Sequence, residues 1–206
     1  MLATRPAAPG TVAGTVSMVA QWLLAPTLAV GLWLAVPAPR PRVAHWALAA
    51  LAGCFLGDLL PSLVPREVGF LAMVGPFLLA QLAWIGAFLP WRRHALAGWR
   101  RWVATAYLIV AVALLAICLP AAGGLAGPVV GYAAALTTMA VLALGPNRLT
   151  GWGGGLFLLS DALIAIDHFA PQLAPPAVSV AIMATYAAAL GALTTGVRSG
   201  AGDDAQ

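Results

Sequence analysis

The chain has 206 residues, of which 62% are hydrophobic and only 8% charged, whereas a soluble globular domain carries roughly 25% charged residues. The net charge of +4 comes from ten arginines against six acidic residues, and lysine is absent. This composition predicts an integral membrane protein. It excludes an opsin-like retinal protein, which needs a lysine for its Schiff base. It also excludes a nucleic-acid-binding domain, because the arginines lie singly or in pairs between apolar segments.

Apolar stretches bounded by charge, proline and glycine predict about seven membrane-spanning helices. Each break contains proline or glycine, which end helices for backbone reasons. We therefore expect an all-α, polytopic bundle that forms one transmembrane domain over residues 1–206, with short polar tails at about 1–11 and 199–206. In chain order, the predicted helices cover approximately 13–36, 44–60, 68–89, 102–120, 128–144, 152–168 and 177–197.

Arginine-rich loops alternate with arginine-poor loops between these helices. With seven spans, eight arginines fall on one side of the membrane, and only Arg5 and Arg66 fall on the other. Because arginine-rich loops stay in the cytoplasm, this asymmetry predicts an outside N-terminus and a cytoplasmic C-terminus. We expect a multi-pass protein of a bacterial cell membrane.

Three aspartates lie within or at the end of predicted helices. Asp58 lies toward the outer end of 44–60, Asp161 near the middle of 152–168, and Asp167 at the end of that helix. Both helices run in the same direction, so a rise of about 1.5 Å per residue places Asp58 and Asp161 between mid-membrane and the outer side. In a shared cavity two carboxylates cannot both stay ionised at low cost, so one is expected to hold a proton. Such a pair suits acid/base hydrolysis.

Each of these residues also has a purely structural interpretation. Asp58 would cap its helix or reach the interface, Asp161 would hydrogen-bond a neighbouring helix, and Asp167 would be an interfacial residue. Gln81 would orient a water or a lipid oxygen, or form an interhelical hydrogen bond. Arg66 would pair with a nearby carboxylate or hold a lipid phosphate, which its fork geometry fits.

Neither a metal site nor a cofactor is expected. The two cysteines, Cys54 and Cys118, lie in apolar runs and belong to no Cys-x-x-Cys or Cys/His cluster. The three histidines, His45, His94 and His168, do not offer two facing imidazoles at similar depth, as a bis-histidine haem would need.

Three segments together resemble a known family. Residues 55–88, FLGDLLPSLVPREVGFLAMVGPFLLAQLAWIGAF, contain a Gly-Asp pair, a short Pro/Arg turn and a Phe-rich helix. Residues 153–169, GGGLFLLSDALIAIDHF, contain a second aspartate after Gly-x-x-x-Phe-x-x-Ser, and residues 182–193, IMATYAAALGAL, contain a Thr-Tyr pair. In this order and at these spacings they resemble the YhhN family, also called the lysoplasmalogenase family.

The resemblance implies hydrolysis of the vinyl-ether bond of lysoplasmalogens to a fatty aldehyde and a glycerophospho-base. Such a reaction begins with protonation of the alkene carbon and continues with attack of water on an oxocarbenium ion. A lysophospholipid substrate and membrane lipids are the implied partners. The resemblance implies Asp58 and Asp161 as catalytic residues. We expect Gln81, Trp84, Tyr186, Arg66 and Ser160 to bind the substrate around this pair.

The chain departs from the family pattern at several positions. Gln81 and Trp84 stand where the family has His-x-x-Tyr, Ala25 stands in place of the lysine of a Lys-Pro pair, and the glutamine expected after Tyr186 is missing. A diverged, non-catalytic membrane protein that binds lipid or a small molecule is therefore the alternative. A proton-coupled transporter is less favoured, because no pair of Pro/Gly-broken helices occurs in matching halves.

Overall fold

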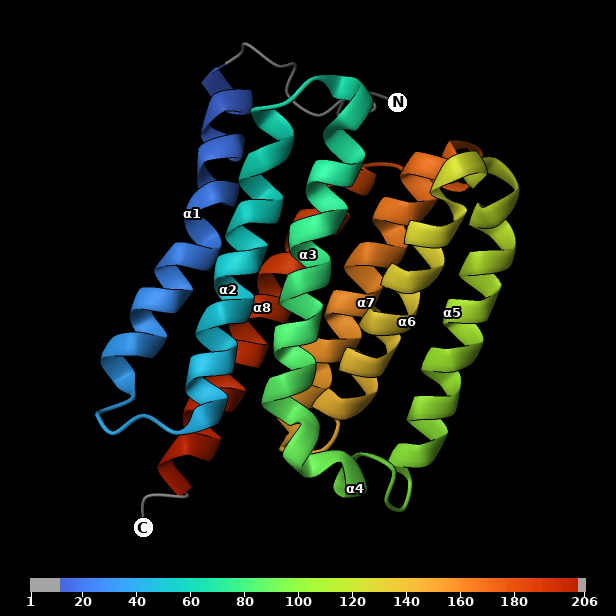
Figure 1. Cartoon of the computed structure of the whole chain (residues 1–206). Helices are drawn as coiled ribbons and strands as arrows, with labels where there is room; N and C mark the ends of the chain where they lie inside the picture. Colours follow the sequence, from blue (N-terminus) through green and yellow to red (C-terminus); the bar gives the residue numbers. More distant parts are fainter. Residues whose placement is uncertain (1–11, 204–206) are drawn as a thin grey trace.

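Seven long helices lie side by side in one bundle, each running opposite to the one before it (Figure 1). The computed structural model describes the backbone of residues 12–203 and the side chains of residues 18–200 except that of Arg66. Within that part the chain is helical with no strand, which confirms the predicted all-α fold. The long helices are α1 (Val12–Ala35), α2 (Arg42–Leu59), α3 (Arg66–Phe88), α5 (Arg100–Ala122), α6 (Ala126–Ala143), α7 (Arg148–Phe169) and α8 (Val178–Asp203).

Short helical elements occupy several of the connections. The four-residue α4 (Arg92–Ala95) lies at one end of the bundle, which we call the α4 end (Figure 1). Single 3₁₀ turns cover Leu60–Ser62, Leu89–Trp91, Gly123–Leu125 and Pro171–Leu173. Three of these four turns contain proline near their start, where a missing backbone N–H costs little.

The described residues form six helical segments that are long and apolar enough to cross a membrane. One of them, Arg100–Ala143, is 44 residues long and contains both α5 and α6. Gly123 ends α5 with a φ of +49°, a conformation that residues with a Cβ rarely adopt. The chain then turns back, and α6 runs antiparallel to α5 (Figure 1). The count of seven spans and the orientation of the termini stay predictions from the sequence.

The predicted helix boundaries agree with the structure to within two residues, except at two places. Helix α7 begins at Arg148 rather than near residue 152, because Asn147 and Thr150 form a capping box at its N-terminus. Helix α8 continues to Asp203, so the predicted polar tail from residue 199 begins inside the helix.

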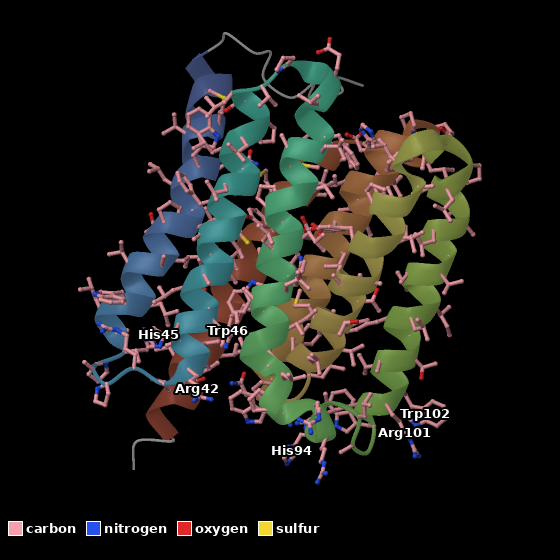
Figure 2. All side chains as sticks on the ribbon, viewed as in Figure 1. Arg42, His45, Trp46, His94, Arg101 and Trp102 are labelled. Atoms are coloured by element: carbon pink, nitrogen blue, oxygen red, sulfur yellow. The ribbon has the colours of Figure 1, made fainter. Side chains whose placement is uncertain are left out.

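Basic side chains gather at the α4 end. Figure 2 shows Arg42, His45, His94 and Arg101 there, together with the indole rings of Trp46 and Trp102. Acidic residues among positions 18–200 belong instead to α2, α3 and α7, on the half of each helix away from the α4 end. The arrangement matches the arginine asymmetry of the loops, in which one side of the membrane carries most of the positive charge.

Helix α7 packs closely on three neighbours because it carries three successive glycines. A Cβ on Gly153 would lie 2.7 Å from Cγ of Leu193 in α8, and a Cβ on Gly154 would lie 2.8 Å from Cβ of Ala143 in α6. A Cβ on Gly155 would collide with the hydroxyl group of Tyr107 in α5. Successive residues point about 100° apart around a helix, so each glycine serves a different contact. Small residues let helix backbones approach in lipid, and these contacts position α7, which carries Asp161.

Candidate active site

Asp58 is held in place by donors from two other helices. It lies near the end of α2 and is only 8% exposed. Its Oδ1 accepts a hydrogen bond from Nε2 of Gln21 at 2.9 Å, and its Oδ2 accepts one from the hydroxyl group of Tyr186 at 2.8 Å. Nε1 of Trp22 donates to the Asp58 backbone oxygen at 3.1 Å. Both carboxyl oxygens are therefore occupied as acceptors, and α1, α2 and α8 meet at this residue.

Asp161 is engaged on one oxygen only. It lies in the second half of α7, where the hydroxyl group of Tyr132 from α6 donates to its Oδ2. Its Oδ1 has no hydrogen-bond donor in the part of the chain that the structure describes. One oxygen of this carboxyl group is therefore held by a tyrosine, and the other is free to bind another group.

A cavity lies between α3, α5, α6 and α7 and is lined by both Asp161 and Tyr132. It offers about 90 Å³ to the centres of water-sized molecules, where one water needs roughly 10–15 Å³. The other wall residues are almost all apolar, including Phe70, Phe77 and Leu136. The cavity can therefore hold a small apolar group or several waters, with the Asp161–Tyr132 pair as the polar part of its wall.

Asp58 does not line this cavity, and an aromatic group connects the two aspartates. Phe77, which forms part of the wall, contacts the ring of Tyr186 edge to face with 5.8 Å between centroids. Tyr186 in turn binds Asp58, and Phe157 packs against both rings. The predicted pair is therefore arranged as one group on the cavity and a second group behind its wall.

Of the four helices around the cavity, α6 packs on all three others. Helix α3 packs on α2 and α6, whereas α5 packs on α6 and α7. In Figure 1, α3 and α5 stand on either side of α6 and α7.

Three other predicted site residues lie outside the cavity wall. Gln81 and Trp84 of α3 are both fully buried, and neither the Gln81 amide atoms nor Trp84 Nε1 have a hydrogen-bond partner among the described residues. Ser160, next to Asp161, is buried and donates to the backbone oxygen of Ile182 in α8 at 3.2 Å. Ser160 thus links two helices, while Gln81 and Trp84 have polar atoms that form no hydrogen bond with other described residues.

The last predicted site residue, Arg66, begins α3 at the end of the bundle opposite α4, where Asp167 and His168 also lie. The side chain of Arg66 lies outside the described residues. Asp167 is exposed, and the exposed ring of His168 stacks on Phe70 with 4.2 Å between centroids. Because Phe70 lines the cavity, this end of α7 forms its rim.

Sequence reasoning did not identify Tyr132 or Gln21 as site residues. Both are polar residues inside predicted membrane helices, a signal that would have indicated a functional or packing role. Trp22 has the position of an interface anchor, but its indole N–H binds the backbone of Asp58. Among the described residues, no group of three or more His, Cys, Asp or Glu side chains is arranged to hold a metal ion.

Long apolar helices, with a carboxyl–hydroxyl pair on the wall of an apolar cavity between them, are the features of a multi-pass membrane protein. The model of the YhhN family matches residues 16–197, and the chain belongs to this family. No solved structure matches the chain.

Two curated relatives are proteins named lysoplasmalogenase, from Mycobacterium bovis and from Mycobacterium tuberculosis. Each is 37% identical to this chain over 168 residues, a stretch that covers 79% of this chain and 64% of the relative. The matched region therefore spans somewhat less than two thirds of the length of these relatives.

Proposed function

We propose that the protein hydrolyses the vinyl-ether bond of lysoplasmalogens, releasing a fatty aldehyde and a glycerophospho-base. Membership of the YhhN family and the likeness to proteins named lysoplasmalogenase support this proposal. The observation that carries it is the Asp161–Tyr132 pair on the wall of an otherwise apolar cavity between membrane helices. Such a cavity suits the apolar end of a single-chain lipid that enters from the bilayer.

Asp161 acts as the general acid. A vinyl ether must be protonated on carbon before water can attack. The free Oδ1 of Asp161 delivers a proton to the alkene carbon that lies away from the ether oxygen, which leaves an oxocarbenium ion and an aspartate. Water adds to the cationic carbon and gives its proton back to the protein. The resulting hemiacetal then separates into the aldehyde and the alcohol of the glycerophospho-base.

Asp58 supplies a fixed negative charge behind the cavity wall. Both of its oxygens accept hydrogen bonds from neutral donors, Gln21 and Tyr186, and an ionised carboxylate is an acceptor only. A charge that is already oriented stabilises a developing cation without reorganisation in the transition state. The two aspartates therefore have different roles: Asp161 donates the proton, and Asp58 stabilises the developing cation.

Two asparagine variants test this assignment. We expect Asp161→Asn to lower the release of aldehyde from a purified lysoplasmalogen by at least about a hundredfold, since general acids contribute roughly 10²–10⁴ in rate. Asp58→Asn should lower the rate as well, with less effect on KM. Asp167→Asn, on an exposed residue at the helix end, is the matched control and should keep the wild-type rate. Full activity in folded Asp161→Asn or Asp58→Asn protein contradicts the mechanism.

Binding without catalysis is the second candidate function. The nearly apolar cavity wall favours it, and so do Gln81 and Trp84 at positions where the family pattern has His and Tyr. A folded wild-type protein that releases no aldehyde but retains an intact lipid through purification, identified by mass spectrometry, would support this function over hydrolysis.

A further inference from the structure

Gln81 and Trp84 form a small polar site in an otherwise apolar core. Both side chains are fully buried, and three of their polar atoms, Gln81 Nε2, Gln81 Oε1 and Trp84 Nε1, have no partner within residues 18–200. The two residues lie three apart on α3 and therefore on the same face of the helix. A buried polar atom left without a hydrogen bond costs about 1–3 kcal/mol. Such atoms normally bind water or a ligand.

This polar site adjoins the reactive pair. Gln81 lies one helical turn after Phe77, which lines the cavity together with Tyr132, and α3 packs on α6 at this level. The Gln81 amide is directed toward Tyr132 without completing a hydrogen bond, and the Tyr132 hydroxyl group donates to Asp161. A tyrosine hydroxyl has one proton and two acceptor lone pairs. Because its proton points to Asp161, its oxygen remains able to accept from a molecule held at Gln81. An amide that can both donate and accept is well suited to orient such a molecule.

We propose that Gln81 holds the hydrolytic water and that Tyr132 relays the proton of this water to Asp161. The inference rests on the proposed vinyl-ether hydrolysis. As the water oxygen bonds to the cationic carbon, one water proton passes to the Tyr132 oxygen, while the Tyr132 proton passes to Oδ2 of Asp161. Tyr132 ends neutral, and Asp161 regains the proton that Oδ1 gave to the alkene. The balance is one vinyl ether and one water converted to one aldehyde and one alcohol.

The relay also provides polar groups that can hold a water molecule, which the cavity wall mostly lacks. The wall is almost entirely apolar, so water has few groups there that can hold it in an attacking position. The hydroxyl group of Thr137, another wall residue, is already bonded to the backbone oxygen of Ala133 in its own helix. Besides the Asp161–Tyr132 pair, the amide of Gln81 offers both a donor and an acceptor without a hydrogen-bond partner within residues 18–200.

Deuterium exchange in heavy water distinguishes a relay from a structural role. Transfer of a deuteron to the alkene carbon leaves that carbon with one hydrogen and one deuterium. When water capture is fast, the cation proceeds to aldehyde, and unreacted lipid recovered at half-conversion contains no deuterium. When capture is slow, the cation returns a proton to the protein, and part of the recovered vinyl ether carries deuterium.

We expect Gln81→Met and Tyr132→Phe to lower kcat about tenfold or more and to place deuterium in the recovered lipid. Both changes preserve side-chain volume. Trp84→Phe replaces the buried indole by a smaller ring without an N–H. It should change kcat and the deuterium content in the same direction, but by less. Thr138→Val is the matched control, because Thr138 is exposed on α6 and its hydroxyl group binds only the backbone of its own helix. This control and the wild type should show no exchange.

Each outcome has a definite meaning once thermal melting has shown that a variant is folded. Lower turnover without deuterium in the recovered lipid overturns the relay, because general damage to the site slows protonation itself. Wild-type kcat in Gln81→Met or Tyr132→Phe also overturns it and leaves hydrolysis intact. Absence of turnover in the wild type refutes the proposed function and this inference together. Because the two variants lie on different helices, misfolding of one leaves the other as the test.

Discussion

The contact between α7 and α8 depends on the missing side chain of Gly153, and Gly153→Ala measures that dependence. The added Cβ would lie 2.7 Å from Leu193 Cγ and 2.9 Å from the Leu193 backbone nitrogen. Because a backbone atom cannot rotate away, the two helices must move apart. Overpacking typically costs about 1–3 kcal/mol, and replacing a helical glycine by alanine returns about 0.5–1 kcal/mol. We expect a net loss of about 1–2 kcal/mol of unfolding free energy.

Thermal melting of the purified protein in detergent is the assay. For a chain of this length, the expected loss corresponds to a fall in Tm of about 2–8 °C. Gly191→Ala on α8 is the control, because a Cβ there meets nothing within 4 Å, so its Tm should stay unchanged or rise. If Gly153→Ala has the same Tm as Gly191→Ala, the close approach at Gly153 is not what holds α7 against α8, and the packing argument fails.

Three further substitutions test the cavity wall, the support of Asp58 and the cap of α7. Gly57→Ala places a Cβ against the ring of Phe77 on the cavity wall. We therefore expect the rate of hydrolysis in an aldehyde-release assay to fall several-fold. An unchanged rate would contradict the role of Phe77 in the wall. Tyr186→Phe keeps the ring contacts but removes a donor to Asp58. Hydrogen bonds to charged groups are worth about 1.5–3 kcal/mol, so kcat should fall about tenfold while KM changes less than about twofold. Thr150→Val removes a fully buried hydroxyl group from the capping box, which should cost about 1–2 kcal/mol in thermal unfolding; an unaltered Tm would show that the cap is dispensable.

The helices could be predicted from the sequence because lipid leaves the backbone few alternatives. A segment in hydrocarbon must satisfy its own N–H and C=O groups, so each long apolar run becomes a helix and each Pro/Gly break becomes a turn. The early start of α7 was missed because its signal is polar. Asn147 and Thr150 begin the helix through reciprocal side-chain and backbone hydrogen bonds, which hydropathy does not register.

The surroundings of the two aspartates could be predicted only in part. Tyr186 came from the resemblance to the family, and the structure places it on Asp58. Gln21 and Tyr132 were not found, although each binds a predicted aspartate. Hydropathy indicates how deep a residue lies, but not which way its helix is turned or which helix is its neighbour.

The sequence by itself determined the membrane class and the order of the helices, because these follow from the solvent that each segment requires. Only the tertiary structure decided that Asp161 faces the cavity while Asp58 lies behind the wall. The physical reason is rotation about the helix axis, which close packing sets. Contacts such as those of Gly153 and Gly154 orient α7, and that orientation directs the carboxyl group of Asp161 toward the cavity.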